Sequence, residues 1–181
     1  LGNSRLTFSI AAALSGPLLP LVGMEPGAIH FFGHSSSGKS TLLRAAWSVW
    51  GGPEGLRTWR ATANALEGIA SIHADTLLAL DEIGQADLRA LDEAAYLLLN
   101  GRGKMRANVD GSSRATRAWS LMVLSTGEPT LADRLTEDGK KPRAGQEVRL
   151  VDIPADAGQG LGAWESIHGQ ATPAQFSDEI K

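Results

Sequence analysis

The sequence of 181 residues has no cysteine, which excludes disulfide bonds and thiolate zinc sites and makes a reducing cytoplasm the natural compartment. It also has no excess of positive charge. The formal net charge is -3, which argues against a generally basic nucleic-acid coat protein and leaves only local basic patches to consider. The apolar segment from Leu6 to Leu14 is too short to span a bilayer, and Gly16 and Pro17 interrupt it before it could act as a secretion signal.

Apolar residues make up 43% of the chain, which is enough for a sizeable core, and the length fits one α/β domain. The five tryptophans are expected to serve mainly in packing. Because the chain begins with Leu1 rather than methionine, we expect it to be a piece of a larger protein.

A glycine- and serine-rich motif, GHSSSGKST, follows an apolar stretch from Ala28 to Phe32. Glycines in such a loop allow backbone amides to turn toward phosphate groups, and the helix that follows adds positive potential at its first turn. Lys39 is expected to reach the β and γ phosphates, Ser40 to ligate Mg2+, and Thr41 to donate to a phosphate oxygen. The predicted nucleotide-binding residues are Gly33, His34, Ser35, Ser36, Ser37, Gly38, Lys39, Ser40 and Thr41.

Strand-like and helix-like segments alternate along the chain. Strands are predicted at about 28–32, 56–60, 76–80, 119–124 and 148–153, and helices at about 5–14, 39–49, 62–73, 87–100 and 130–137, with Thr62 and Asp87 as N-caps. This alternation predicts a doubly wound α/β sheet of five mainly parallel strands flanked by helices.

Two acidic residues, Asp81 and Glu82, follow the apolar run from Thr76 to Leu80, at the edge where parallel sheets place their ligands. Asp81 is expected to hold Mg2+ through its hydration shell, and Glu82 to orient and deprotonate the water that attacks the γ phosphate. Such a carboxylate favours hydrolysis, although a phosphotransferase stays an alternative. Because this strand is the second after the phosphate-loop strand, we expect another strand between the two in the sheet.

The segment between Gly101 and Arg117 is basic within an otherwise acidic chain, and its Asp110-Gly111 pair is a strong hairpin turn signal. We therefore expect a β-hairpin insertion before the strand at 119–124. Its cations would grip phosphates with little dependence on base sequence, although a charged, solvated loop is the alternative. The predicted DNA-binding residues are Arg102, Lys104, Arg106 and Arg114.

The four histidines show no spacing typical of a metal site; they are His30, His34, His73 and His168. His30 lies within a predicted strand and is expected to be a hydrogen-bonded core residue. His34 fills a variable position of the phosphate loop.

Several runs of the sequence resemble the Cch-like predicted helicases of bacterial mobile elements and prophages. These runs are GHSSSGKSTLLRAAWSVWG, WRATANALEGIA, LLALDEIGQAD, NGRGKMRAN, LSTGE and AGQEVRLVDIP. The resemblance covers nearly the whole chain and implies a P-loop ATPase core of the AAA+ type within the additional-strand (ASCE) class. Such a core is similar to those of the replicative helicases of the minichromosome maintenance group and of viral superfamily III helicases, which work as rings.

The resemblance also assigns roles by position. It makes Gly33, Gly38, Lys39 and Ser40 the Walker A residues and Asp81 with Glu82 the Walker B pair. It places Ser125 and Thr126 at the sensor 1 position, where many AAA+ proteins have asparagine. Arg149 occupies the place of an arginine finger that enters a neighbouring subunit's site, and Arg143 is the competing candidate.

The function that the resemblance implies is Mg2+-dependent ATP hydrolysis that drives translocation along single-stranded DNA, as the core of a replicative-type helicase of a mobile element. The resemblance also implies a homo-oligomeric ring, expected to be a hexamer. No association with a membrane is expected. The alternative is a non-translocating AAA+ switch, such as a helicase loader or assembly regulator. We expect an N-terminal helix and linker at 1–27, the ATPase core at 28–155, and a C-terminal extension at 156–181 that begins a truncated lid.

Overall fold

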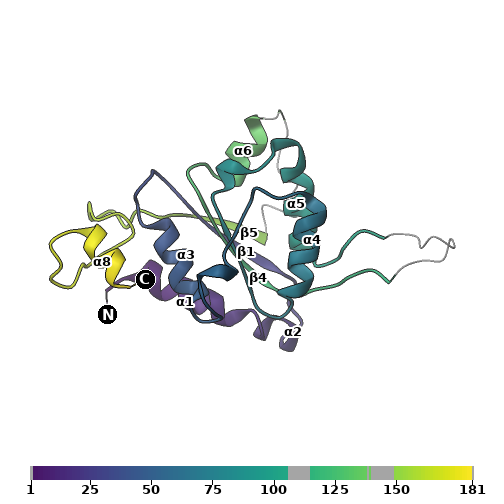
Figure 1. The fold of residues 1–181 in the computed structure, drawn as a ribbon, viewed down its shortest axis with the longest axis horizontal. Helices are drawn as coiled ribbons and strands as arrows, with labels where there is room; N and C mark the ends of the chain where they lie inside the picture. The colour runs from purple at the N-terminus through teal and green to yellow at the C-terminus, as the bar shows by residue number, and fades with distance from the viewer. Residues whose placement is uncertain (1, 106–114, 138, 140–148, 181) are drawn as a thin grey trace.

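A sheet of five parallel strands separates two layers of helices (Figure 1). The structure is a computed structural model that describes residues 2–105, 115–137, 139 and 149–180. The strands are β1 (Gly27–Phe32), β2 (Arg57–Thr58), β3 (Leu77–Asp81), β4 (Met122–Gly127) and β5 (Leu150–Pro154), and their order in the sheet is β2-β3-β4-β1-β5. The predicted five-stranded α/β sheet is confirmed, and all of its strand pairs are parallel.

Helices cover both faces of this sheet. One face packs against α1 (Ser4–Ser15) and α3 (Lys39–Trp47), and the other against α4 (Ala63–Ile72), α5 (Leu88–Asn100) and α6 (Leu131–Glu137). Shorter helical turns are α2 (Leu18–Leu21), η1 (Pro53–Gly55), η2 (Ile83–Gln85) and α8 (Pro173–Glu179). Within the described part of the chain, no helix combines the length and apolarity needed to cross a lipid bilayer.

The two layers follow from the alternation of side chains along each strand. Ile29 and Phe31 of β1 join the core beneath α1 and α3, whereas Ala28 joins the core beneath α4 and α5. Leu42 and Leu43 of α3 are completely buried on the first side. These strands are apolar on both faces because helices cover both faces.

Helix boundaries carry the capping chemistry that the sequence predicts. The Thr62 hydroxyl accepts a hydrogen bond from the amide of Ala65 at 3.2 Å, and the Asp87 carboxylate accepts one from Arg89 at 2.9 Å. Both predicted N-caps are confirmed. Gly101 ends α5 with a φ of +68°, and a Cβ there would lie 2.8 Å from the carbonyl oxygen of Trp119.

The strand predicted between β1 and β3 in the sheet is present, but it is β4, which comes later in the chain. The strand between them in sequence, β2, lies at the sheet edge and pairs only with β3 through two residues, Arg57 and Thr58. The prediction of five strand residues at 56–60 is therefore too long. The backbone turns away after Thr58, where the Trp59 amide still donates to Asp81 O at 3.2 Å.

The boundaries of β4 differ from the predicted strand at 119–124 by three residues. Trp119 lies before the strand, with its indole buried and its Nε1 donating to Leu98 O at 3.1 Å. Pairing with β3 begins only at Met122. As a consequence Ser125 and Thr126 lie within β4 and not after its end.

The base of the predicted hairpin is present. Arg102 and Ala118 form an antiparallel bridge, and the Gly103 amide donates to Arg117 O at 2.8 Å. The described arms on either side of the bridge extend away from the sheet, on the opposite side of the molecule from α8 (Figure 1). The predicted turn at Asp110-Gly111 lies outside the described residues.

Candidate functional site

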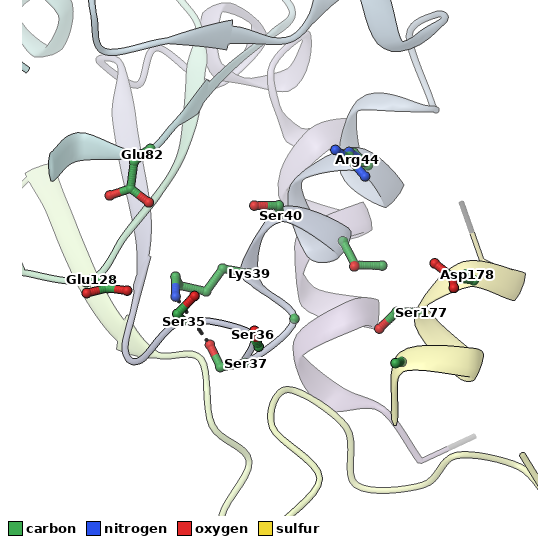
Figure 2. Close-up of a pocket in the computed structure, with 13 residues that line it drawn as sticks. Ser35, Ser36, Ser37, Lys39, Ser40, Arg44, Glu82, Glu128, Ser177 and Asp178 are labelled. Carbon is green, nitrogen blue, oxygen red and sulfur yellow. Dashed lines mark hydrogen bonds between the residues drawn. The ribbon is translucent and has the colours of Figure 1, made fainter. Parts of the chain in front are cut away.

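A pocket of about 330 Å³ opens at the carboxyl ends of the central strands, around the start of α3 (Figure 2). Its walls come from the phosphate loop, from the residues after β3 and β4, and from α8. The lining residues are Ser35, Ser36, Ser37, Gly38, Lys39, Ser40, Thr41, Arg44, Glu82, Glu128, Ala174, Ser177 and Asp178. Apart from Gly33 and His34, every predicted nucleotide-binding residue lines this pocket.

The loop from 33 to 38 has the backbone of a phosphate cradle. Gly33 and Gly38 have φ angles of +142° and +92°, which glycine adopts without steric cost, and Ser36 has a left-handed φ of +62°. Gly38 precedes α3, whose first-turn amides face the pocket end of the helix. A loop of this conformation presents backbone N–H groups to an anion.

Lys39 is the cation within the phosphate loop, and its side chain is held by the loop backbone. Its Nζ donates to Gly33 O at 2.8 Å and to His34 O at 2.6 Å. Burial lowers the pKa of Lys39, and the charges of Glu82, Glu128 and Asp81 act in the opposite direction. The ammonium is therefore confined to the position where a terminal phosphate group would need a counter-charge.

Asp81 connects three elements of the site. It accepts from the Ser40 hydroxyl, 3.3 Å from each carboxylate oxygen, and from Thr126 Oγ1. Hydroxyl and carboxylate oxygens are the donors that Mg2+ prefers, and they leave room for several waters. Ser40 and Asp81 thus fit the Mg2+ site that the sequence predicts, and Ser40 would bind the cation while Asp81 holds its waters.

Glu82 follows with an unusual backbone conformation. Its φ of +56° lies in the left-handed region, which is costly for a residue with a side chain and is concentrated at functional sites. The Glu82 amide donates to Thr126 Oγ1 at 3.2 Å, and its carboxylate accepts from the Gly84 amide at 3.2 Å. This turn directs the carboxylate into the pocket, where the sequence predicts the base for an attacking water.

The two predicted sensor residues have different surroundings. Thr126 contacts both Asp81 and Glu82, as a sensor of the site would. Ser125 is completely buried and contacts neither Asp81 nor Glu82 through a hydrogen bond among the described residues. Its hydroxyl accepts from Trp59 Nε1 at 2.8 Å and lies 2.8 Å from His30 Nδ1. The structure therefore brings Thr126 to Asp81 and Glu82, beside the pocket, and does not bring Ser125 there.

His30 completes this buried group. Its Nε2 lies 3.0 Å from Pro129 O, a pure acceptor, so Nε2 carries the proton and Nδ1 accepts from Ser125. Burial lowers the pKa of His30 to about 4, opposed by the Pro129 carbonyl and reinforced by Lys39, so the ring is neutral at pH 7. The prediction that His30 is a hydrogen-bonded core residue is confirmed.

Arg149 lies at the amino ends of the strands, opposite to the end where the pocket opens. It immediately precedes β5 and forms an ion pair with Glu25, which comes just before β1. The phosphate loop follows the opposite end of β1, so within one chain Arg149 is remote from Lys39. A role as an arginine finger would require a neighbouring chain, and the competing Arg143 lies outside the described residues.

The predicted DNA-binding residues are described only in part. Arg102 lies at the antiparallel bridge, and Lys104 forms an ion pair with Glu93 of α5 at 2.6 Å. Arg106 and Arg114 lie outside the described residues.

Sequence reasoning missed four polar side chains of the pocket. Glu128 and Arg44 line the pocket, as do Ser177 and Asp178 of α8. Glu128 belongs to the run LSTGE and could have been noticed as a carboxylate two positions after Thr126. The α8 residues gave no signal, because they follow a glycine-rich stretch far from the motifs.

The C-terminal extension returns to the phosphate loop. The Ala163 amide donates to Ser37 O at 2.7 Å, and Trp164 is buried next to Gly38. Trp164 Nε1 then donates to the Ser177 hydroxyl at 3.2 Å, and its ring packs edge-on against Phe176. This C-terminal strap, residues 155–180, places α8 on the open side of the pocket.

Gly162→Ala is expected to loosen this strap. Gly162 has a φ of +65°, and a Cβ there would lie 2.8 Å from Ser37 O, so the phosphate loop must shift. The left-handed backbone alone costs about 1–2 kcal/mol. We therefore expect a lower Tm together with weaker ATP binding, measured by thermal unfolding and by nucleotide titration.

Gly158→Ala is the matched control for this change. Gly158 has a similar φ of +78° but nothing within 4 Å of an added Cβ. It should lose some stability and keep the affinity for ATP. Equal affinities in both variants would show that the strap does not support the phosphate loop.

Known proteins support the same architecture. The family model described as Domain of unknown function (DUF927) matches residues 1–118. Among solved structures, the active helicase Cch of SCCmec type IV is similar, with a TM-score of 0.69 and 24% identity over 97% of this chain. The chain spans 30% of the length of that helicase.

A more distant structure is NtrX from Brucella abortus in complex with ATP. It has a TM-score of 0.45 and 15% identity, and the match covers 90% of this chain and 38% of NtrX. No curated protein is a significant match. The chain shares its P-loop fold with the Cch helicase, and by the match over residues 1–118 it belongs to the DUF927 family.

Proposed function

We propose that this chain is the ATPase core of a helicase and that it hydrolyses ATP with Mg2+. The proposal rests mainly on one observation: Lys39, Ser40 and Glu82 line one pocket, and Asp81 and Thr126 lie beside it, where Asp81 accepts from Ser40 and from Thr126. The lysine serves the terminal phosphates, the hydroxyl and carboxylate oxygens fit Mg2+, and Glu82 lies where a water would attack. The bound Mg2+ would neutralise charge on the phosphates.

The arrangement favours hydrolysis over binding alone. A switch that only binds nucleotide needs the loop, Lys39 and the cation. Glu82 adds a carboxylate on a left-handed backbone, held by Thr126 and by the following turn. Arg134 of α6 supports that turn, since its Nη2 donates to Gly84 O at 2.9 Å and to Ala86 O at 3.2 Å.

We further propose that hydrolysis moves the hairpin arms along single-stranded DNA, in a homo-oligomeric ring. The arms extend from the domain near α4 and α5, on the side away from α3 and α8 (Figure 1), whose residues line the nucleotide pocket. Lys104, paired with Glu93, and Arg102 supply positive charge at their base. Phosphate contacts of this kind give binding that weakens with salt and depends little on base sequence.

A hairpin variant tests the DNA-binding part of this proposal. Lys104→Gln combined with Arg106→Gln, in the full-length protein, is expected to abolish stimulation of ATP hydrolysis by single-stranded DNA while basal hydrolysis persists. Removing two phosphate contacts should also lower the slope of log K for DNA binding against log salt concentration by about two. ATPase, unwinding and DNA-binding titrations at several salt concentrations measure these effects.

Glu93→Gln is the control, because it breaks the same ion pair and leaves Lys104 charged. It should retain stimulation by DNA. If the Lys104→Gln/Arg106→Gln variant keeps both DNA-stimulated ATP hydrolysis and unwinding, the alternative is favoured. That alternative is a non-translocating switch in which nucleotide state controls partner binding.

A further inference from the structure

A second carboxylate, Glu128, lies in the nucleotide pocket in addition to Glu82. It follows β4 directly and is exposed to the pocket. In Figure 2 both carboxylates lie on the side of Lys39 away from α8, and the end of the Lys39 side chain points toward them. The two acidic side chains therefore share the end of the pocket where Lys39 would hold the terminal phosphate.

The backbone that carries Glu128 is fixed to the phosphate-loop strand. The amide of Gly33, the first residue of the phosphate loop, donates to the carbonyl oxygens of both Gly127 and Glu128 at 3.2 Å. One residue further on, Pro129 O accepts from the buried His30 ring at 3.0 Å. The position of Glu128 relative to the loop is thus set by hydrogen bonds on both sides of it.

The same turn is supported from within the core. His30 is held by Ser125, and Ser125 in turn accepts from the indole of Trp59. Gly127 packs closely against Ile83 and His30 and leaves no room for a side chain, since a Cβ there would lie 2.5 Å from Ile83 Cγ2 and 3.3 Å from the His30 ring. A turn anchored this firmly to β1 and to the residue after Glu82 holds the two carboxylates in a defined relation to each other.

Glu82 by itself leaves the attacking water incompletely oriented. One of its oxygens, Oε1, accepts from the Gly84 amide. A water molecule has two O–H bonds, and a single acceptor fixes only one of them. A second acceptor on the other side would fix both and leave a lone pair directed at the phosphorus, which is the positioning that hydrolysis requires.

We propose that Glu128 is a second carboxylate of the hydrolytic centre, which accepts one O–H of the attacking water while Glu82 accepts the other. In this step the water oxygen bonds to the γ phosphorus, and the bond from that phosphorus to the bridging oxygen breaks with its electron pair leaving on ADP. The water proton held by Glu82 moves to that carboxylate and is released afterwards. Glu128 orients the water and keeps its charge. This inference rests on the proposed ATP hydrolysis.

The test is Glu128→Gln in the full-length protein, which keeps the size of the side chain and removes its charge. The kcat for ATP is expected to fall about 100-fold. The Kd for ATP should stay the same or decrease, because one negative charge near the γ phosphate is gone. Steady-state phosphate release and titration with a non-hydrolysable ATP analogue measure the two quantities separately.

Further variants separate an effect on water from an effect on folding. Glu128→Ala should lose kcat to a similar extent with an unchanged Tm. Because both carboxylates would act on one water, the double variant Glu82→Gln/Glu128→Gln should be no slower than Glu82→Gln alone. Glu54→Gln, an exposed carboxylate of η1 outside the pocket, is the control and should keep the wild-type kcat.

Two results would overturn the inference. One is a kcat of Glu128→Gln within about twofold of the wild type. The other is a loss of kcat/KM that comes entirely from weaker ATP binding. Neither result affects the proposed ATPase activity, which fails only if the wild-type protein does not hydrolyse ATP or if Lys39→Ala hydrolyses it equally well.

Discussion

Glu82→Gln is expected to reduce the kcat for ATP hydrolysis by about 100- to 10,000-fold. The amide of glutamine cannot accept a proton from the attacking water, but its carbonyl oxygen can still accept from the Gly84 amide and so preserve the turn. ATP binding should persist, because Lys39 and the Ser40–Asp81 pair are unchanged. Phosphate release and nucleotide titration on the same preparation measure both effects.

The same variant discriminates between reaction classes. A phosphotransferase takes its nucleophile from an acceptor substrate and would lose little ATP turnover with glutamine at this position. Glu82→Ala is a useful companion, since it also removes the cap of the η2 turn and should reduce the Tm. Wild-type turnover in Glu82→Gln would contradict the hydrolytic role of this residue.

Arg149→Ala is expected to reduce ATP hydrolysis by about 1,000-fold or more if its guanidinium enters the site of a neighbouring chain. Within one chain Arg149 lies at the amino end of the strands, opposite to the end that carries Lys39, and it pairs with Glu25. Any effect of Arg149 on catalysis would therefore have to act between subunits. Glu25→Gln is the matched control, because it breaks the same ion pair and keeps the guanidinium, and it should hydrolyse ATP normally.

Mixing subunits makes the Arg149 prediction specific. Arg149→Ala subunits and Lys39→Ala subunits should each be inactive alone. In an equal mixture about a quarter of the interfaces combine an intact lysine with an intact arginine, so about a quarter of wild-type hydrolysis should return. No recovery in a mixture that forms rings would contradict a finger supplied by Arg149.

Much of the fold could be predicted because its signals are local. The apolar runs before Gly33 and Asp81 identify two central strands, and Thr62 and Asp87 mark helix starts by their capping chemistry. The start of β4 could not be predicted in this way. Trp119 is apolar and looks like a strand residue, but its buried indole donates a hydrogen bond to Leu98 O of α5, and the residue lies before the strand.

In the candidate site, too, some residues are identified by local sequence signals and others only by tertiary contacts. The Walker residues could be found because each is specified by its neighbours in sequence. Ser125 and Thr126 are adjacent in a strand, so only one of them can face the pocket, and alternation alone does not say which. Glu128 and the α8 residues Ser177 and Asp178 reach the pocket through hydrogen bonds formed by Gly33, His30, Ser37 and Trp164, which link distant parts of the chain.

We propose that this chain hydrolyses ATP at the pocket around Lys39. The most direct test is Mg2+-dependent release of phosphate from ATP by the full-length protein, compared with its Lys39→Ala variant. We expect steady release by the wild-type protein that stops when Mg2+ is chelated, and almost none by Lys39→Ala. Equal release by both proteins, or none by a wild-type protein that binds ATP, would contradict it.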